Sequence, residues 1–346
     1  MPDAANITLP VQPSTAADPR LVDRFGRVHT KLRVSVTDRC NLRCTYCMPA
    51  AGIAVAPKES LLTFEEIERV VRLVAGLGVR QVRLTGGEPL VRRDMPVLVE
   101  RLAGIAGLED LSMTTNAVLL DTLAAPLRRA GLQRVNISLD ALDPEVFRRV
   151  TRRDGYDRVL AGIEAAREAG FDPIKINVVS TRGVTDNQVV PFGHFARDTG
   201  MEVRFIEYMP LDGPRGWSRD RVLGGAEIRD SLSSAILPLI PVGDPTGSPA
   251  TEYEFADGVG RIGFIPTVTA PFCAKCDRFR LTADGKLRSC LFSLDEFDLR
   301  GPLRDGADDE QLANVIGDAL RAKEAGHGIN SPTFVQPERT MSAIGG

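Results

Sequence analysis

Histidine, lysine and long apolar stretches are scarce in this 346-residue sequence, and each scarcity narrows what the protein can be. The chain has 3 histidines, and only six of its 43 basic residues are lysines. Because arginine is the default cation, a single arginine carries little information, whereas a lysine inside an apolar strand carries more. No apolar run approaches the roughly 20 residues that a membrane-spanning helix needs, which excludes an integral membrane protein.

The charge and the N-terminal segment exclude further classes. A net charge of −3 gives no global reason to expect nucleic-acid binding. Residues 1–20 lack the basic start and apolar stretch of a secretory signal, so they predict a disordered tail on a cytoplasmic protein. The apolar fraction of 43% and charged fraction of 26% are typical of globular chains. This length allows one large domain with an appendage.

The six cysteines fall into two groups of three, with none left over. Odd groups disfavour a disulfide framework. Buried structural thiols would not cluster at the spacings that metal ligands adopt, so metal binding is favoured for both groups. The first triad is Cys40, Cys44 and Cys47, and the second is Cys273, Cys276 and Cys290.

The first triad has the spacing C-x3-C-x2-C. Three thiolates can hold a cubane cluster and leave one iron without a protein ligand, and soft thiolates favour iron–sulfur clusters or zinc. A structural zinc site would require a fourth cysteine or histidine. None of the histidines, at positions 29, 194 and 327, lies at a finger-like offset from the triad. The spacing therefore favours a cluster with an open coordination position.

A second motif, RLTGGEP at residues 83–89, ends another apolar strand. Its two glycines allow close approach of the backbone to a ligand, and Glu88-Pro89 restricts the exit. With the aromatic Tyr46 before the last cysteine of the first triad, this motif resembles the radical S-adenosylmethionine family. The resemblance implies that the open iron binds the amino and carboxylate groups of S-adenosylmethionine. One electron then cleaves this cofactor to a 5′-deoxyadenosyl radical, which abstracts hydrogen from the substrate.

Strand-like and helix-like patterns alternate through the first two thirds of the chain. This alternation predicts a parallel sheet with right-handed crossovers. Thr63 and Glu66 form a capping-box pattern that predicts the start of one helix. The expected strands are 33–37, 81–85, 110–115, 134–139, 174–179 and 202–208; further helices are expected near 94–104, 119–130, 156–169 and 188–199.

Six such units are two short of a complete (β/α)8 barrel. The resemblance implies an α/β protein with an incomplete (β/α)6 TIM-type barrel, in which ligands bind at the carboxyl ends of the strands. After about residue 215, glycine and proline become frequent and short strand-like pieces follow. We expect the barrel at 21–215 and a smaller C-terminal region with the second triad at 216–346, packed over the open side.

The second triad has the spacing C-x2-C-x13-C, and Asp284-Gly285 between its last two cysteines predicts a hairpin. From spacing alone, a zinc ribbon that lacks one ligand remains an alternative to a second cluster. The Arg278-Phe279-Arg280 segment and the C-terminal Gly345-Gly346, together with both triads, resemble the GTP 3′,8-cyclase family of molybdenum cofactor biosynthesis. This resemblance covers roughly residues 20–346.

That resemblance implies two [4Fe–4S] clusters and a lyase reaction. Hydrogen is taken from C3′ of GTP, and the carbon radical attacks C8 of guanine to give (8S)-3′,8-cyclo-7,8-dihydroguanosine 5′-triphosphate. The open iron of the second cluster contacts guanine. The implied partners are a second copy of the chain in a homodimer, a reductant protein such as flavodoxin or ferredoxin, and a downstream cyclic pyranopterin monophosphate synthase.

Site residues carry over by position. Lys175 also stands out on physical grounds, because it alternates with Ile174 and Ile176, and an anionic ligand is a less costly explanation than an unpaired buried ammonium. The implied S-adenosylmethionine contacts are Tyr46, Gly87, Ser138 and Met209. The implied GTP contacts are Arg33, Arg83, Thr114, Lys175, Arg278, Phe279 and Arg280, among which Arg278 and Arg280 are the candidate catalytic residues.

Two other functions remain open at this point. One is a radical S-adenosylmethionine enzyme that modifies a peptide or another small molecule and uses the second cluster for electron transfer. Such peptide-modifying relatives usually carry more auxiliary cysteines than the three found in this chain. The other is a non-catalytic binding module stabilised by zinc, which would be colourless and free of iron.

Overall fold

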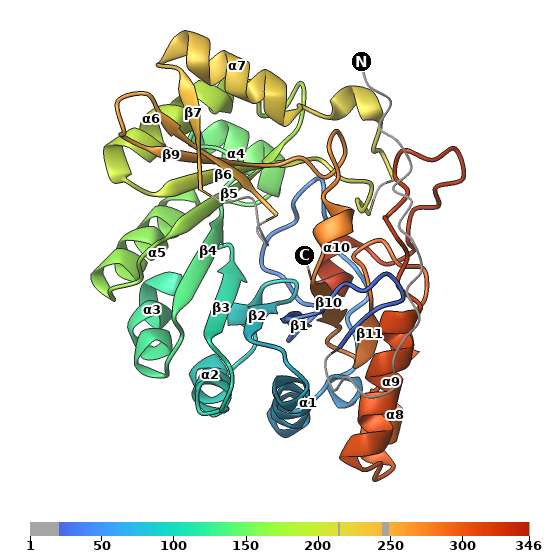
Figure 1. Cartoon of the computed structure of the whole chain (residues 1–346). Coiled ribbons are helices and arrows are strands. Elements are labelled where there is room, and N and C mark those ends of the chain that lie inside the picture. Colours follow the sequence, from blue (N-terminus) through green and yellow to red (C-terminus); the bar gives the residue numbers. More distant parts are fainter. Residues whose placement is uncertain (1–20, 214, 244–248, 346) are drawn as a thin grey trace.

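A single continuous sheet of twelve strands organises the chain, with helices on its outer side (Figure 1). The computed structural model describes residues 21–213, 215–243 and 249–345. The expected tail at 1–20 and the last residue, Gly346, lie outside the described residues. Within them, the strand order is β12-β11-β10-β1-β2-β3-β4-β5-β6-β9-β8-β7, and the two end strands are not paired with each other. The barrel is therefore open.

The centre of the sheet consists of the six expected strands, all parallel and in chain order. The predictions are confirmed, with ends that differ by at most two residues. The largest difference is in the first strand, which begins and ends two residues early because the chain turns into the first cysteine loop. The strands are β1 (Lys31–Ser35), β2 (Gln81–Thr85), β3 (Asp110–Thr115), β4 (Arg134–Ser138), β5 (Lys175–Ser180) and β6 (Glu202–Glu207).

Helices connect these strands along the outside of the curved sheet (Figure 1). Helix α4 was not expected from the sequence, although the residues at its start, Asp143 and Pro144, are typical of a helix N-terminus. The Asp143 carboxylate accepts hydrogen bonds from the amides of Glu145 and Val146, and Pro144 occupies the first helical position. The helices are α1 (Phe64–Gly76), α2 (Met95–Ala103), α3 (Leu120–Arg129), α4 (Pro144–Thr151), α5 (Tyr156–Glu168) and α6 (Val189–Thr199).

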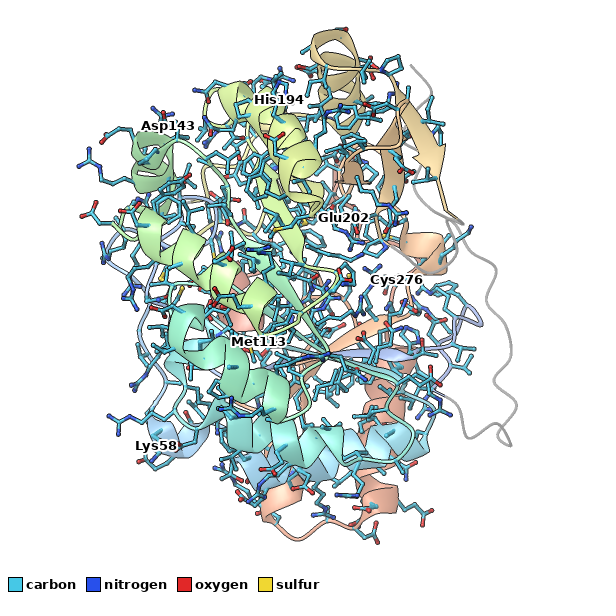
Figure 2. The ribbon with its side chains drawn as sticks, turned by 90° about the vertical axis from the view of Figure 1, so that its left-hand side faces the viewer. Lys58, Met113, Asp143, His194, Glu202 and Cys276 are labelled. Atoms are coloured by element: carbon cyan, nitrogen blue, oxygen red, sulfur yellow. The ribbon has the colours of Figure 1, made fainter. Side chains whose placement is uncertain are left out.

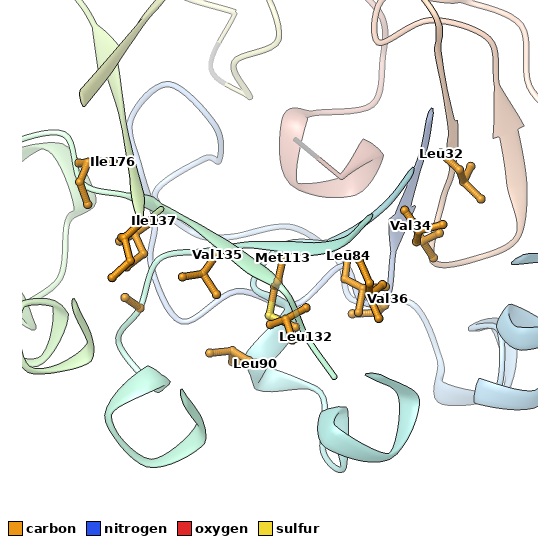
Figure 3. Close-up of a cluster of buried hydrophobic side chains, with 14 of the residues drawn as sticks. Leu32, Val34, Val36, Leu84, Leu90, Met113, Leu132, Val135, Ile137 and Ile176 are labelled. Atoms are coloured by element: carbon orange, nitrogen blue, oxygen red, sulfur yellow. The ribbon is translucent and has the colours of Figure 1, made fainter. Parts of the chain in front are cut away.

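Apolar side chains from the outer face of the sheet pack against the helices to form the main core (Figure 3). Figure 3 shows Leu84, Met113 and Val135 from three neighbouring strands directed toward the helical layer. All three are fully buried. This layer fixes the strands from behind, so the opposite, concave face remains for polar side chains.

The capping box predicted at Thr63 is confirmed. The Thr63 hydroxyl accepts from the Glu66 amide at 3.1 Å, and the Glu66 carboxylate accepts from the Thr63 amide at 2.7 Å. These bonds satisfy two of the backbone donors that a helix start leaves unpaired. They also fix the direction in which α1 leaves the loop after the first triad.

We expect Thr63→Ala to lower the free energy of unfolding by about 1 kcal/mol, because the helix loses its cap. The measurement is urea denaturation under argon, followed by circular dichroism. Thr122→Ala is the control, because the Thr122 hydroxyl is exposed and its 3.4 Å contact with the Leu119 carbonyl does not cap the helix. Equal denaturation midpoints for the two variants would contradict the capping role.

The C-terminal region extends the sheet on both sides. Strand β9 pairs in parallel with β6, and β10 pairs in parallel with β1, so eight parallel strands lie side by side. The remaining strands pair antiparallel at the two ends. The elements are α7 (Gly225–Ala235), β7 (Leu239–Val242), β8 (Thr251–Phe255), β9 (Arg261–Ile265), β10 (Arg278–Leu281), β11 (Lys286–Arg288), β12 (Phe297–Asp298), α8 (Arg300–Arg304), α9 (Asp309–Arg321) and α10 (Met341–Ile344).

The end of the described chain lies on the concave side of the sheet, where α10 sits beside β1 and β10 (Figure 1). A Cβ atom added to Gly345 would lie 2.7 Å from the Thr85 hydroxyl oxygen and 2.8 Å from the Ser35 Cβ. The C-terminal segment therefore reaches the carboxyl ends of β1 and β2. No helix among the described residues combines the length and the apolar character that crossing a bilayer requires.

Candidate active site

Both cysteine triads line one cavity of about 280 Å³ on the concave face of the sheet. Residues from the parallel strands form its floor, the first cysteine loop forms one wall, and the C-terminal region forms the opposite wall. Segments more than 200 residues apart in the sequence thus face one space. The cavity is the place where two reactive groups could act on one bound molecule.

The first triad lies in the loop that follows β1. Burial raises the pKa of the Cys40 thiol to about 11 and that of Cys47 to about 12. The Leu42 amide contacts the Cys40 sulfur at 3.4 Å, and Asn116 on the β3 side lies 3.9 Å from the same atom. Such buried thiols ionise only when a positive group binds them, and iron would supply that charge.

The Gly-Gly motif after β2 holds this loop in place. The Gly87 amide donates to the Thr37 carbonyl at 2.7 Å, and the Glu88 amide donates to the Arg39 carbonyl at 2.8 Å. A Cβ atom on Gly87 would lie 2.7 Å from the Arg39 carbonyl carbon and 2.8 Å from the Asp38 oxygen. We expected the glycines to let the backbone come close to a ligand. The structure shows that the backbone at Gly87 also lies close to the cysteine loop.

Two buried carboxylates support the same wall. Burial raises the pKa of Glu88 to about 7, although its carboxylate accepts hydrogen bonds from Thr115 at 2.6 Å and from the Asn116 amide at 2.7 Å. Burial also raises the pKa of Asp140 to about 6, and this carboxylate accepts from the Tyr46 hydroxyl at 2.8 Å. Tyr46 is thereby held in a fixed orientation inside the cavity.

The second triad surrounds a hairpin, as the Asp284-Gly285 pair predicted. Strands β10 and β11 pair antiparallel with Arg280 opposite Arg288. Cys273 and Cys276 precede the hairpin, and Cys290 follows it, so all three reach the cavity. Burial opposes ionisation of Cys276, but the charges of Lys323 and Arg278 together with hydrogen bonds from Arg278 outweigh burial and lower the pKa of this thiol to about 7.

The donor set of each triad fits an iron–sulfur cluster. Among the described residues, no three cysteine, histidine or acidic side chains are arranged to hold one metal ion. A cubane cluster has no such requirement, because its three protein ligands bind three different irons. The three thiols of each triad line one wall without a fourth protein ligand, which fits a [4Fe–4S] cluster with one open iron.

Three arginines lie in a row across neighbouring strands. Arg33 on β1 is in register with Arg83 on β2 and with Arg280 on β10. Residues in register on adjacent strands lie about 5 Å apart on the same face of a sheet. Burial lowers the pKa of Arg83 and of Arg280 to about 10, and lowers that of Arg33 well below its usual range.

No ion pair among the described residues involves any of these three arginines. Repulsion between the guanidinium groups adds to the effect of burial on the pKa of Arg33. Like charges side by side on adjacent strands are destabilising unless an anion neutralises them. The row therefore forms a preorganised site for a polyanion in the cavity that both triads line.

The described C-terminal residues contact one end of this row of arginines. The Arg280 guanidinium donates to the Gly345 carbonyl, and Ser342 of α10 contacts the Cys47 thiol and lowers its pKa, against the larger effect of burial. Arg278 lies with its guanidinium 4.8 Å from the centre of the Phe272 ring. The C-terminal segment thus contacts both the first triad and Arg280, which lies on β10 between the last two cysteines of the second triad.

Most of the expected site residues meet in this cavity. Gly87 and Tyr46 come from the first wall, and Ser138 lies at the end of β4. The expected residues that line the cavity are Arg33, Cys40, Cys44, Tyr46, Cys47, Arg83, Gly87, Thr114, Ser138, Met209, Cys273, Cys276, Arg278, Arg280 and Cys290.

Two expected GTP contacts do not line it. Lys175 is not an unpaired ammonium, because its Nζ lies 2.6 Å from the Glu202 carboxylate and 3.9 Å from Glu252. Contrary to the expectation from the sequence, Lys175 therefore needs no anionic ligand to balance its charge. The Phe279 side chain is 2% exposed and belongs to the main core, because neighbouring residues of a strand face opposite sides of the sheet.

Several residues that line the cavity were not expected from the sequence, including Arg204, Asn177 and His327. Arg204 donates to Glu202 and, at 2.9 Å, to Glu252, so it shares the acidic partners of Lys175. Arg204 and Asn177 lie in expected strands. Their places in the alternation of the two strand faces could have indicated that they face the concave side. His194, by contrast, lies on the surface of α6, well apart from Cys276 (Figure 2).

Comparison with known proteins agrees with this geometry. Residues 34–196 match the radical SAM superfamily model, and residues 201–329 match the Molybdenum Cofactor Synthesis C model. The chain resembles solved structures of Streptococcus suis SuiB, with a TM-score of 0.61 at 16% identity over 90% of this chain and 76% of that chain. This likeness shows the fold. The fold and the two triads define a radical S-adenosylmethionine enzyme.

Curated relatives define the family more narrowly. A GTP 3′,8-cyclase of Rhodopirellula baltica is 50% identical over 96% of this chain and 94% of its own length. The GTP 3′,8-cyclase of Streptomyces coelicolor is 48% identical over 94% of this chain and 96% of its own. The chain belongs to the GTP 3′,8-cyclase family, and is thus a lyase that uses S-adenosylmethionine and [4Fe–4S] clusters in molybdenum cofactor biosynthesis.

Proposed function

We propose that this chain converts GTP to (8S)-3′,8-cyclo-7,8-dihydroguanosine 5′-triphosphate within the cavity between the two triads. The observation that carries the assignment is the row of three arginines in register, which lines the same cavity as both triads and has no carboxylate partner among the described residues. A triphosphate bears about four negative charges and satisfies this row through charge-assisted hydrogen bonds. The proposal thus explains why so many cations share one buried space.

The first triad holds the cluster that binds S-adenosylmethionine. Bound together, cluster and cofactor supply a radical that abstracts hydrogen from the substrate. The chain positions this cofactor through Tyr46, Gly87, Ser138 and Met209, which all line the cavity. The hydrogen bond from Tyr46 to Asp140 fixes the aromatic ring before the cofactor arrives.

The second triad holds the cluster that faces guanine. Arg33, Arg83 and Arg280 hold the triphosphate, with Arg278 and Thr114 beside them, and Arg278 and Arg280 also stabilise charge on the base during cyclisation. The C-terminal segment closes the cavity over the row. Held between two fixed walls, C3′ and C8 stay close to each other and away from water, which a radical reaction requires.

Lys175 contributes to this site indirectly, through the carboxylate of Glu202. Glu202 lies between Lys175 and Arg204, and of the two cations only Arg204 lines the cavity. We assign Arg204 to the substrate site and Lys175 to the support of Arg204. The Phe279 side chain supports the strand from the core side and leaves its two neighbouring arginines facing the cavity.

The partners are proposals of the same kind. Hydrogen abstraction in this family consumes an electron, so the enzyme requires a reductant protein such as flavodoxin or ferredoxin. The cyclised nucleotide passes to a cyclic pyranopterin monophosphate synthase, and the enzyme acts as a homodimer in the cytoplasm. The six free cysteines are consistent with a reducing compartment.

Arg280→Ala should reduce kcat/KM for GTP about a hundredfold or more, because a buried donor to the charged substrate is lost. Iron content and absorbance should stay near the wild-type values, since Arg280 is not a cluster ligand. The control is Arg148→Ala, which removes an exposed arginine paired with Glu145. Loss of iron in the Arg280 variant would mark the residue as structural and contradict its assignment.

Anaerobic turnover tests the function as a whole. Reconstituted protein is mixed with GTP, S-adenosylmethionine and dithionite, and the products are analysed by mass spectrometry. We expect 5′-deoxyadenosine together with a nucleotide isomeric with GTP. Formation of deoxyadenosine without such an isomer would support the radical chemistry but would contradict the assignment of GTP as the substrate.

A further inference from the structure

Lys323 approaches the second triad from the side opposite the cavity. It lies two residues beyond the end of α9 and is 2% exposed. Its ammonium donates to the Arg278 carbonyl at 2.6 Å and lies 3.6 Å from the Cys276 sulfur. Because Lys323 does not line the cavity, it contacts the triad without reaching the substrate.

The charge of this lysine has no carboxylate partner among the described residues. No ion pair there includes Lys323, and two acids in this part of the fold pair with other cations. Asp23 lies 2.5 Å from the Arg27 guanidinium, and Asp277 lies 3.0 Å from the Lys31 ammonium. A buried ammonium that lacks a compensating anion is costly. The sulfur of Cys276 is the one candidate anion that these described contacts place beside it.

The surrounding structure holds Lys323 in this position. Arg27 donates to the carbonyls of Cys273, Glu324 and Ala325, at 2.9, 2.7 and 2.9 Å. One buried arginine therefore ties the segment after Lys323 to the first cysteine of the second triad. The Lys323 amide also donates to the Leu320 carbonyl at the end of α9. These two anchors hold the backbone of Lys323 in place beside the second triad.

We propose that Lys323 is a positioning residue that tunes the second cluster, donating a charged hydrogen bond to the Cys276 thiolate and raising the cluster's reduction potential. The reduced cluster carries one more negative charge than the oxidised cluster, so a nearby buried cation stabilises the reduced form more. Hydrogen bonds to ligand sulfurs and local charge are established determinants of cluster potential. This inference rests on the proposed assignment of a cluster to the second triad.

The alternative is that Lys323 only satisfies the Arg278 carbonyl. That role needs a hydrogen-bond donor but no charge, and it predicts no effect on the cluster potential once the protein is folded. Three substitutions separate the roles. Lys323→Met removes both donor and charge, Lys323→Gln keeps a donor without charge, and Lys323→Arg keeps both. Lys275→Met is the matched control, because it removes an exposed lysine adjacent to Cys276 in the sequence.

The experiment is an anaerobic redox titration monitored by electron paramagnetic resonance. It uses full-length protein in which Cys40, Cys44 and Cys47 are serine, so that every signal comes from the second cluster. We expect a more negative midpoint potential for Lys323→Met and Lys323→Gln than for Lys323→Arg, whose potential stays close to that of the parent. Lys275→Met should leave the potential unchanged.

Equal potentials for Lys323→Met and the parent, at equal iron content, would overturn the proposal. If Lys323→Met retains too little iron to titrate, iron content decides. If Lys323→Arg retains iron and Lys323→Gln does not, the result supports a role for the positive charge. If both variants or neither variant retains iron, the result overturns the proposal. Absence of iron from the parent itself would overturn the cluster assignment instead, so the two failures are distinguishable.

Discussion

Cys44→Ser is expected to reduce the cleavage of S-adenosylmethionine to the background level. Cys44 lies in the middle of the first triad, packed against the main core and close to both Cys40 and Cys47. A serine hydroxyl is a hard and weakly acidic ligand that does not replace a thiolate on iron. With two cysteines left, the loop cannot hold the cluster that activates the cofactor. The measurement is anaerobic 5′-deoxyadenosine formation by chromatography, with iron quantified in parallel.

Cys290→Ser is the matched variant in the other triad. It leaves the first wall of the cavity intact, so deoxyadenosine should still form, whereas the cyclised nucleotide should be absent. The reason is spatial: Cys290 follows the β10–β11 hairpin on the opposite wall, where the proposed guanine contact lies. Equal deoxyadenosine yields from the Cys44 and Cys290 variants would show that the triads do not have separate roles.

Gly87→Ala is the second substitution with a large expected effect. The added methyl group would lie 2.7 Å from the Arg39 carbonyl carbon and 2.8 Å from the Asp38 oxygen, and both atoms belong to backbone that cannot move without shifting the loop. This loop leads directly into Cys40. Displacement by about 1 Å costs reactions of this kind about a hundredfold. We therefore expect cleavage of S-adenosylmethionine to fall by about that factor, and iron to fall toward about half as the first cluster is lost.

Gly76→Ala is the control for this substitution. Gly76 is the last residue of α1, and a Cβ atom there meets nothing within 4 Å. The same change in side chain should therefore leave iron content and cleavage at the wild-type level. Wild-type iron and activity in Gly87→Ala would show that the loop tolerates the added atom, and would contradict the role of the glycine in holding the first triad.

The sequence predicted the parallel core because local signals and burial agree there. Apolar, β-branched runs recur between helical patterns, and each expected strand is present. The capping box at Thr63 and the hairpin at Asp284-Gly285 were also predicted, since both depend on residues close together in the chain. The cysteine spacings indicated which thiols act together. Helix α4 was missed, although Asp143-Pro144 marks its start.

Features that depend on contacts between distant segments could not be predicted in this way. The pairing of β10 with β1 places Arg280 beside Arg33, and no local pattern encodes a register between residues that far apart. The sequence showed that Lys175 lies in an apolar strand, but the carboxylate of Glu202 beside it comes from the neighbouring strand. The partners of Lys323 likewise appear only when α9 is placed against the second triad.

The two alternative functions make different predictions from those of a GTP cyclase. A zinc-stabilised binding module would be colourless. It also gives no reason for three arginines that line the cavity without carboxylate partners in the described part of the chain. A peptide-modifying radical S-adenosylmethionine enzyme would share this fold, and the likeness to Streptococcus suis SuiB shows the fold alone. It would not require a preorganised site for a triphosphate. The identity of the atom that loses hydrogen separates these possibilities.

The most direct test of the central claim is anaerobic turnover with GTP deuterated at C3′ of the ribose. If this cavity holds GTP between the two triads, mass spectrometry will show one deuterium transferred to 5′-deoxyadenosine, in step with the cyclised nucleotide. Deoxyadenosine that carries no deuterium from labelled GTP would show that GTP is not the molecule from which hydrogen is taken, and would contradict the proposed function.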